Sequence, residues 1–304
     1  MKQRRGQRFP LYDVGDKAVI VTGASSGIGY ATALLFAARG ARVVAAARSA
    51  EPLAVLQQQA QAAGGVLITQ VTDVTDPAAC RALVDRCVSE FGGVDVLINN
   101  AGISMRSLTI ETDVAVLRRL MEVNFWGTVH CTKAALPWLL KSPRGVLVGV
   151  SSVAGFHGLP GRSGYSASKF AMHGFLESIR IEHLPDGLHV LVVAPGFTRS
   201  GIRTHALTGD GREQSETPRS EGKLMSPEDV AHHILRAIRW RKRNRIVSFE
   251  AQFVALVQRI LPHFIDWLIY RSMAKEPGSP LRERAVEDAA NRVDSREDVA
   301  SPEE

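Results

Sequence analysis

Two residues with complementary acid–base chemistry, Tyr165 and Lys169, stand four positions apart in the sequence. Four residues make about one turn of an α-helix, so the phenol and the ammonium would project from the same face. A tyrosine normally keeps its proton until about pH 10. A lysine charge nearby favours the phenolate and lowers the pKa of the tyrosine, which gives a proton donor and acceptor near neutral pH. The pair therefore predicts acid–base catalysis, provided that other segments supply a cofactor and a place for it.

A glycine-rich turn near the N-terminus supplies the first part of such a place. Residues 17–22 are a short apolar run rich in β-branched side chains, residues 23–29 read GASSGIG, and residues 30–39 are apolar and rich in alanine. Strand, glycine turn and helix in this order form the context that a dinucleotide-binding fingerprint needs. The glycines let the backbone approach a pyrophosphate, whose charge meets the N-terminus of the helix.

Strand-like and helix-like segments alternate along most of the 304 residues, of which 45% are hydrophobic. The expected strands lie near residues 17–22, 41–46, 66–72, 94–98, 145–150, 188–193 and 245–249. This alternation predicts an α/β fold, a Rossmann-type doubly wound parallel sheet of about seven strands with helices on both faces, in a single domain. A cofactor would then lie at the carboxyl ends of the strands.

The glycine spacing and several later motifs resemble those of the short-chain dehydrogenase/reductase family. Residues 22–29, TGASSGIG, are similar to the family's T-G-x-x-x-G-x-G signature, and residues 99–102 read NNAG. Asn124 corresponds to the family's helix asparagine, and Pro195–Gly196 to the P-G pair after the sixth strand. The resemblance extends over residues 17–200, in the order and spacing of the family.

The resemblance implies a role for each catalytic candidate. Tyr165 would be the general acid for carbonyl reduction and the general base for alcohol oxidation, while Lys169 would bind the nicotinamide ribose and keep the pKa of the tyrosine low. Ser152 would hydrogen-bond the substrate carbonyl, and its neighbour Ser151 is the weaker candidate for that role. Asn124 would hold a water molecule that links the lysine to solvent. The nicotinamide would carry the hydride, so the protein would supply orientation and protons.

The end of the second expected strand indicates which cofactor is preferred. Enzymes that prefer NAD usually place a carboxylate there for the ribose 2′-hydroxyl, but this chain has Ala47 followed by Arg48. A guanidinium suits a 2′-phosphate, which predicts NADP(H), although Arg48 could also be a solvated residue opening the next helix. Asp73 corresponds to the family's aspartate near the adenine ring. The resemblance implies that the other cofactor-binding residues are Thr22, Gly23, Ser25, Ser26, Gly27, Ile28, Gly29, Val74, Asn100, Ala101, Gly102, Pro195, Gly196 and Thr198, together with Tyr165 and Lys169.

Residues 199–225 lie where the family has its mobile substrate lid, and they are polar, with glycines and no clear periodicity. The lid carries several cationic side chains, which could attract an anionic substrate or could simply be solvated. Phe156, His157 and Leu159 follow the serine pair and are expected to line the pocket. His157 could contact the substrate, but a bystander role is also open. None of these features identifies the substrate.

An amphipathic helical segment, residues 250–275, follows the expected single domain at 17–249. Apolar residues recur at helical spacing across 249–271, downstream of a basic cluster at 236–245. The apolar runs are shorter than the roughly 20 residues of a membrane span. The segment could lie on an anionic bilayer surface, pack over the substrate pocket or pack against a second subunit. Each arrangement would surround the pocket with apolar surface, which favours a hydrophobic substrate such as a steroid, a retinoid, or a lipid-like or xenobiotic ketone or aldehyde.

The two ends of the chain carry no motif for chemistry. Residues 1–16 form an N-terminal extension, and residues 276–304, rich in Glu, Asp and Arg, are expected to be a disordered tail. Cys80, Cys87 and Cys131 lack the spacing of metal ligands and are expected to be reduced, buried thiols of a cytoplasmic protein that could also associate with a membrane. The net charge of +6 is not accompanied by a nucleic-acid-binding module. The resemblance implies a homodimer or homotetramer.

These features together predict an NADP(H)-dependent oxidoreductase that interconverts a carbonyl and a secondary alcohol, with the CH–OH group as the hydride donor in the oxidative direction. The alternative is a non-catalytic NADP-binding sensor or adaptor at a membrane surface. The complete set of tyrosine, lysine, serine and asparagine favours the enzyme.

Overall fold

A seven-stranded, fully parallel sheet forms the centre of the protein, in the order β3-β2-β1-β4-β5-β6-β7. The structure is a computed structural model that describes residues 11–199, 201–214, 224–258 and 260–282, with the backbone alone for 249–251. The strands are β1 (Ala18–Thr22), β2 (Arg42–Ala47), β3 (Val66–Val71), β4 (Val96–Asn99), β5 (Val146–Val150), β6 (His189–Ala194) and β7 (Asn244–Ile246). The order reverses direction between β1 and β4, which places a crevice at their carboxyl ends.

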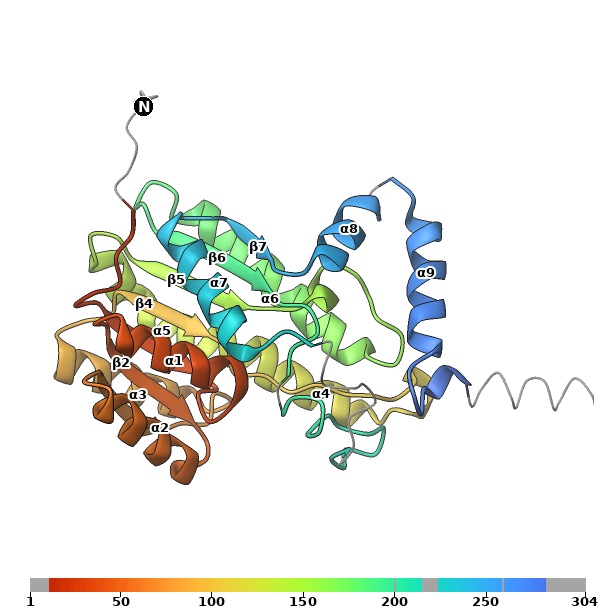
Figure 1. Cartoon of the computed structure of the whole chain (residues 1–304), viewed down its shortest axis with the longest axis horizontal. Coiled ribbons are helices and arrows are strands. Elements are labelled where there is room, and N and C mark those ends of the chain that lie inside the picture. The colour runs from red at the N-terminus through yellow and green to blue at the C-terminus, as the bar shows by residue number, and fades with distance from the viewer. Residues whose placement is uncertain (1–10, 200, 215–223, 259, 283–304) are drawn as a thin grey trace, which may run out of the picture.

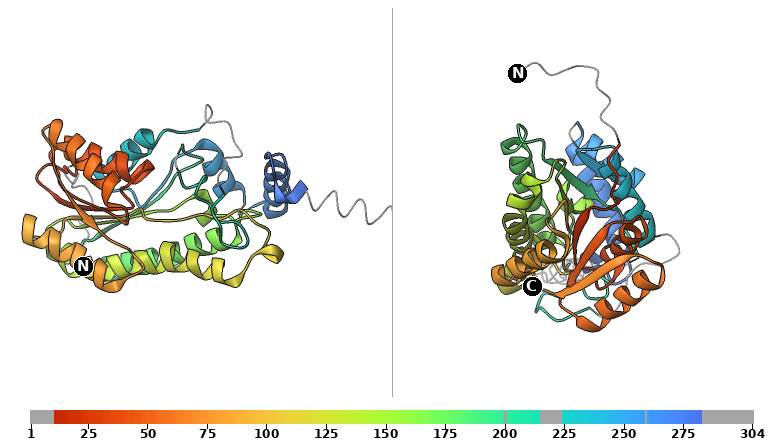
Figure 2. Two further views of the ribbon diagram at one scale, coloured as in Figure 1. Left: turned by 90° about the horizontal axis from the view of Figure 1, so that it is seen from below. Right: turned by 90° about the vertical axis from the view of Figure 1, so that its left-hand side faces the viewer.

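The strands are apolar on both sides because helices cover both faces of the sheet (Figure 2). One face packs against α1 (Gly27–Ala38), α2 (Ala50–Ala62) and α7 (Pro227–Arg239). The other face packs against α3 (Pro77–Phe91), α5 (Gly127–Lys141) and α6 (Ser163–Glu182). Cys80, Cys87 and Cys131 are free, buried thiols in this second layer, as expected from the sequence. The predicted doubly wound, single-domain fold is confirmed.

The last strand ends earlier than the sequence predicts. The expected strand at 245–249 ends at Ile246, and Phe249 already opens the helix α8 (Phe249–Val257). Val247 still donates a backbone hydrogen bond to Ala194 (3.0 Å), so the chain leaves the sheet edge within two residues. An apolar run that continues from an edge strand into a helix offers no change of composition to mark the boundary, which explains the error.

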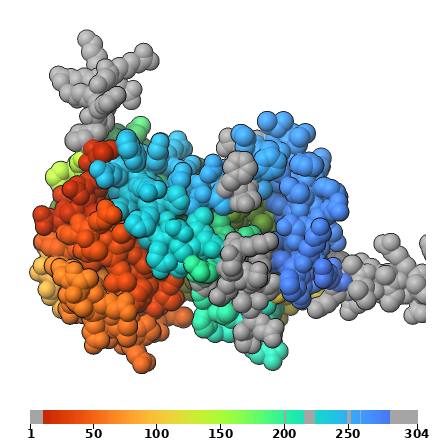
Figure 3. Space-filling view, viewed as in Figure 1, coloured from red at the N-terminus to blue at the C-terminus, as the bar shows by residue number. Residues whose placement is uncertain are grey.

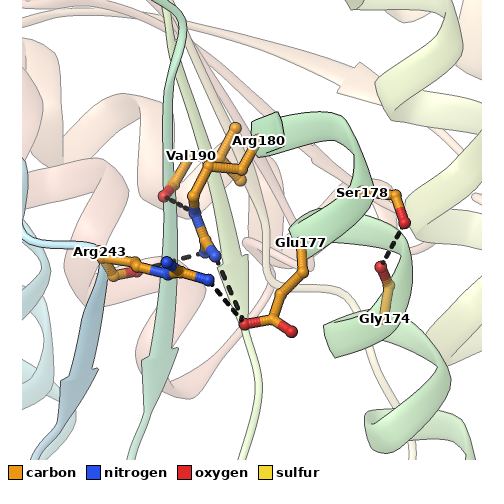
Figure 4. A network of polar contacts seen from close by, with 6 residues as sticks. All are labelled: Gly174, Glu177, Ser178, Arg180, Val190 and Arg243. Carbon is orange, nitrogen blue, oxygen red and sulfur yellow. Dashed lines mark hydrogen bonds and ion pairs between the residues drawn. The ribbon is translucent and has the colours of Figure 1, made fainter. Parts of the chain in front are cut away.

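Helix α6, which carries Tyr165 and Lys169, is fixed at its far end to the last two strands (Figure 4). The guanidinium of Arg180 donates to the carbonyl oxygens of Val190 (3.1 Å) and Arg243 (3.5 Å). The carboxylate of Glu177 pairs with both Arg180 (3.5 Å) and Arg243 (3.3 Å). The position of the helix is therefore set by the sheet as well as by its own buried face.

The C-terminal segment lies beyond the carboxyl ends of the strands, to one side of the sheet (Figures 1 and 3). It consists of α8, of α9 (Pro262–Ala274) and of the following residues up to Arg282. Ile265, Ile269 and Met273 are buried along one side of α9, in a small apolar cluster with Leu159. The segment also contacts the loop after β5, through His157, which lies close to Gln258 and Asp266.

The described residues nearest to the two termini pack more closely than their composition suggests. Tyr12 and Val14 are buried in the core beneath α1 and α7, so part of the predicted extension at 1–16 belongs to the core. A disordered tail was expected from residue 276. For residues 276–282 this expectation does not hold, because Glu276 and Ser279 are buried. Residues 1–10 and 283–304 lie outside the described part of the chain.

Candidate active site

A cavity of about 520 Å³ opens at the carboxyl ends of the strands, where the strand order reverses. Its wall comes from the turn after β1, the ends of β2, β4, β5 and β6, helix α6 and the expected lid. The sequence-predicted residues on this wall are Gly23, Ser25, Ser26, Gly27, Ile28, Arg48, Asp73, Val74, Asn100, Ala101, Gly102, Ser152, Tyr165, Lys169, Pro195, Gly196 and Thr198. Most of the predicted catalytic and cofactor-binding residues therefore lie on this wall, but three of them lie behind it.

Thr22, Gly29 and Asn124 are absent from the wall and instead hold its elements together. The Thr22 hydroxyl accepts hydrogen bonds from the backbone amides of Asn100 (3.0 Å) and Ala101 (3.1 Å), which ties β1 to the loop after β4. A Cβ on Gly29 would stand 2.2 Å from the carbonyl oxygen of Gly23, so only glycine lets α1 approach the turn. Thr22 and Gly29 therefore shape the cavity wall rather than line it, and their part in cofactor binding stays a prediction.

The glycine turn fits the pyrophosphate of a nicotinamide dinucleotide. Gly23 has a φ of +66°, and a Cβ on it would stand 2.7 Å from Ala101. Ser26 precedes the first turn of α1 without a side-chain cap, and that turn carries no acidic residue. The amides at the start of α1 are therefore free of side-chain competition for an anion, which the helix dipole would also favour.

Tyr165, Ser152 and Lys169 come together on one side of the cavity. Ser152 follows β5, and its hydroxyl makes a hydrogen bond with Tyr165 and accepts another from the amide of Ala154 (3.2 Å). The ammonium of Lys169 lies 5.7 Å from the centre of the Tyr165 ring and donates to the carbonyl oxygen of Val150 (3.1 Å). One turn of α6 therefore positions the Tyr165 phenol and the Lys169 ammonium, and the end of β5 positions the Ser152 hydroxyl.

Burial dominates the proton affinities of this pair. It raises the pKa of Tyr165, while the hydrogen bond to Ser152 and the charge of Arg162 act in the opposite direction. Burial also lowers the pKa of Lys169 to about 8. In the protein alone, desolvation of Tyr165 outweighs the favourable charges around it, and the expectation that Lys169 lowers the pKa of the tyrosine stays a prediction.

Asn124 lies in a wide π-helical turn, residues Glu122–Trp126, between α4 (Val114–Met121) and α5. Its side-chain oxygen accepts from the amide of Ile103 (2.8 Å), and its nitrogen donates to the carbonyl of Ile103 (3.0 Å) and to Ser168 (2.9 Å). A Cβ on Gly102 would stand 3.1 Å from the Asn124 oxygen and 3.4 Å from the Lys169 nitrogen. Asn124 therefore supports the wall near the lysine, and its role in a water relay stays a prediction.

The two candidate serines are distinguished by their hydrogen bonds. Ser151 also borders the cavity, but its hydroxyl lies 2.6 Å from Nε2 of His173. Burial lowers the pKa of His173 to about 4, so the ring is neutral at pH 7. Ser152, in contrast, bonds to Tyr165 itself. This arrangement favours Ser152 as the residue that would orient a carbonyl beside the phenol.

Two arginines border the cavity: Arg48, which is exposed, and Arg119 of α4, which the sequence analysis did not identify. A hydrogen bond from His205 is the main cause that lowers the pKa of Glu213, and Arg119 and Arg48 add smaller effects in the same direction. Both arginines border the same cavity as Glu213. No sequence motif marks Arg119, which lies in an ordinary amphipathic helix.

The expected lid does border the cavity, through Gly201, Ile202, Arg203, His205, Leu207 and Glu213, while residues 200 and 215–223 of the predicted segment lie outside the described part of the chain. Of the three residues expected to line the pocket after the serines, only Leu159 does so. Phe156 packs edge-on against His173, with ring centres 4.6 Å apart. His157 turns toward the C-terminal segment, where it contacts Gln258 (2.8 Å) and Asp266 (3.3 Å).

Comparisons with known proteins agree with this geometry. The family described as short chain dehydrogenase matches residues 17–210. Dehydrogenase/reductase SDR family member 7B of Bos taurus is 35% identical over 269 residues, covering 86% of this chain and 83% of that protein. Dehydrogenase/reductase SDR family protein 7-like of Anopheles gambiae is 33% identical over 281 residues, covering 90% of this chain and 87% of that protein.

A solved structure gives the same result. A short chain dehydrogenase/reductase from Burkholderia phymatum, in complex with NAD, superposes with a TM-score of 0.74 at 26% identity, over 84% of this chain and 96% of that one. This chain belongs to the short-chain dehydrogenase/reductase family.

Metal-binding clusters and membrane-crossing helices are both missing from the described residues. These residues contain no group of three or more His, Cys, Asp or Glu side chains that could hold a metal ion. None of their helices is long and apolar enough to cross a membrane.

Proposed function

We propose that the protein is an NADP(H)-dependent oxidoreductase that interconverts a carbonyl and a secondary alcohol, with Tyr165 as the general acid and base. The observation that carries the proposal is that Tyr165, hydrogen-bonded to Ser152, shares one cavity with the glycine turn after β1. The acid–base group and the dinucleotide cradle are thus parts of a single site.

The residues divide the chemistry between them. The bound cofactor supplies or accepts the hydride at the substrate carbon. In the reductive direction, the Tyr165 hydroxyl gives its proton to the carbonyl oxygen, and Ser152 donates a hydrogen bond to that oxygen. The Lys169 ammonium, with a pKa of about 8, is close enough to stabilise the resulting phenolate and to bind the nicotinamide ribose. The Asn124 side chain, bonded to Ile103 and Ser168, fixes the surroundings of that lysine.

The NADP(H) preference rests on Arg48 and is supported by Arg119. At the end of β2, Ala47 is buried and Arg48 borders the cavity, with no carboxylate at either position. A free ribose diol would lack its usual acceptor there, whereas a 2′-phosphate would meet two guanidinium groups. The solved relative bound to NAD shows that a nicotinamide dinucleotide suits the fold.

A hydrophobic substrate is proposed from the apolar part of the wall. Leu159, Ile202, Leu207 and Ile103 border the cavity near Tyr165 and Ser152. The names of the relatives specify no substrate, so a steroid, a retinoid, or a lipid-like or xenobiotic ketone or aldehyde remains the proposed class.

The test is NADPH oxidation measured at 340 nm against ketosteroids, retinaldehydes, aliphatic ketones and aldehydes, and 3-ketoacyl thioesters. Wild type should turn over at least one hydrophobic carbonyl compound, and Tyr165→Phe should bind NADPH equally well while losing turnover. Equal activity in wild type and variant would reject Tyr165 as the acid. NADPH binding without turnover of any class would support a non-catalytic sensor.

A second role is proposed for the outer surface of the C-terminal segment, as a peripheral contact with a lipid bilayer. We call this surface the apolar platform: it consists of the exposed side chains of Phe253, Leu256, Ile260, Leu261, Phe264, Trp267 and Tyr270. Phe264 stacks on Trp267, and the Arg271 guanidinium lies 4.8 Å from the Trp267 ring centre. Amphipathic aromatic residues beside a cation suit the boundary between acyl chains and anionic headgroups. The proposed homodimer or homotetramer would be compatible with this contact only if it left the platform exposed.

A further inference from the structure

A buried ion pair joins the C-terminal segment to the start of helix α6. The guanidinium of Arg162 lies 3.4 Å from the carboxylate of Glu276, although the two residues are 114 positions apart. Only 10% of the Arg162 side chain and 4% of the Glu276 side chain are exposed. Charges removed from water to this extent are costly unless each has a partner, so neither would be stable here without compensation.

Other contacts hold the same two segments together. A second nitrogen of Arg162 lies 3.8 Å from the sulfur of Met273, in the last turn of α9. Arg106 donates to the carbonyl oxygen of Pro277 (2.6 Å), immediately after Glu276. The carboxylate of Glu276 is therefore carried by a segment with its own anchors, and its position does not depend on the ion pair alone.

Arg162 is also part of the catalytic wall. It borders the same cavity as Tyr165 and Ser152. It precedes α6 directly, and its carbonyl oxygen accepts the amide of Ser166 (2.8 Å), so its backbone is fixed relative to the first turn that carries Tyr165. Its positive charge is one of the influences that lower the pKa of Tyr165. The residue thus faces the acid–base group on one side and Glu276 on the other.

We propose that Arg162 is a positioning residue whose effect on Tyr165 is set by Glu276, so that the C-terminal segment is a working part of the catalytic site. This inference rests on the proposed function, in which Tyr165 exchanges the proton. The Arg162 cation favours the phenolate, and the Glu276 carboxylate offsets part of that charge. A movement of residues 262–282, for example on contact with a membrane, would change the balance and with it the acidity of the tyrosine.

The other charged or titratable groups near Tyr165 do not duplicate this pair. Lys169 lies on the same helix, and His173, one turn further, is neutral near pH 7 because burial lowers its pKa to about 4. The remaining charged or titratable groups on the cavity wall are Arg48, Asp73, Arg119, Arg203, His205 and Glu213. Among the wall residues that the structure describes, Arg162 both acts on the pKa of Tyr165 and pairs with Glu276 of the C-terminal segment.

The experiment compares Glu276→Gln, Arg162→Gln and the double variant Arg162→Met/Glu276→Met. Loss of the carboxylate should leave the guanidinium uncompensated and move the ionisation of Tyr165 to lower pH, by roughly half a unit to one unit. Loss of the guanidinium should move it to higher pH by a similar amount. The double variant replaces the buried pair by apolar groups, which proteins often tolerate, and should lie between the two single variants. Asp266→Asn, which breaks a contact of the same segment with His157, is the matched control and should leave the ionisation unchanged.

Two readouts separate this inference from the proposed function. One is the pH profile of kcat with the best carbonyl substrate. The other needs no turnover: the tyrosines are replaced by a fluorinated, more acidic tyrosine, and the ¹⁹F signal of Tyr165 is titrated, with Tyr165→Phe identifying it among the four tyrosines. Opposite shifts in the two single variants support the inference. Shifts in the same direction, or none, overturn it, while activity retained by Tyr165→Phe would overturn the proposed function instead.

Discussion

The two sides of the cavity are built in different ways. On the cofactor side, the backbone does most of the work: parallel strands end side by side, and a glycine turn and a helix N-terminus follow β1. On the substrate side, side chains join segments that are far apart in the sequence, such as His157 with Gln258, and Arg162 with Glu276. A cofactor side built mainly from backbone depends little on individual side chains. A substrate side built from contacts between side chains can change with single substitutions, so substrate specificity and regulation can arise there.

The largest expected effect comes from removing the proposed catalytic acid, Tyr165, which tests whether cofactor binding persists when turnover is lost. Tyr165→Phe removes the phenolic hydroxyl proposed to exchange the proton but leaves the glycine turn intact, so kcat should fall by about 10²–10⁴-fold. The Kd for NADPH, measured by fluorescence, should stay within about twofold. Tyr270→Phe, on the exposed face of α9, is the control and should keep full activity. A variant of Tyr165 that turns over at the normal rate would contradict the assigned chemistry.

The comparison also explains what the sequence could predict. Residues 22–29 and the Tyr165–Lys169 pair are close together in the chain, so local spacing alone implies a turn and a helix face. The sheet followed from apolar runs, because strands covered on both faces are apolar throughout. The structure places most of these candidates on one cavity wall.

The residues that the sequence did not reveal depend on long-range contacts. Arg162 lies in a polar loop, and Glu276 lies in a charged stretch whose composition favours disorder. Neither residue belongs to a local sequence motif that would mark it. Only the folded chain brings the Arg162 guanidinium to within 3.4 Å of the Glu276 carboxylate. The same reasoning applies to His157, whose partners Gln258 and Asp266 are about 100 residues away in the chain.

A second prediction sharpens the comparison at the adenosine end of the cavity. Arg48→Ala removes a guanidinium that would pair with the 2′-phosphate, so the Kd for NADPH should rise about 10–100-fold, while the Kd for NADH should change little. Isothermal titration of both cofactors measures the selectivity directly. Arg39→Ala, at the opposite end of α1, should leave both values unchanged. Equal changes for the two cofactors would show that Arg48 does not read the phosphate.

A third prediction concerns the apolar platform. Phe264→Ala/Trp267→Ala removes two large exposed aromatic side chains, so binding to vesicles of phosphatidylcholine with one-third phosphatidylglycerol should weaken about tenfold or more. Activity on a water-soluble carbonyl compound should be retained, because neither residue borders the cavity. Ile181→Ala/Leu184→Ala removes two comparably exposed residues at the end of α6 and should bind vesicles like wild type. If all three proteins sediment equally with the vesicles, or none does, the platform is not a lipid contact.

The smallest expected effect is a loss of stability at low pH that arises in the sheet and not in the C-terminal segment. His189 in β6 is buried, and Nε2 lies 2.9 Å from the carbonyl oxygen of Lys242. Burial is the main cause that lowers its pKa to about 4, below the usual value near 6.5. Between pH 6.5 and 4, His189 is therefore protonated in the unfolded chain but stays neutral in the folded chain. This contribution to stability is present above pH 6.5 and is lost as the pH falls through that window.

The change from pH 7 to pH 5 should cost about 2 kcal/mol through His189, or several degrees in Tm. His189→Gln can keep the hydrogen bond to Lys242 without the titration, so its Tm should fall less over the same interval, with part of the loss remaining because the pKa of His173 is also about 4. His263→Gln, exposed on α9, should follow the wild-type dependence. If His189→Gln loses as much stability as wild type, the acid sensitivity does not arise in the sheet.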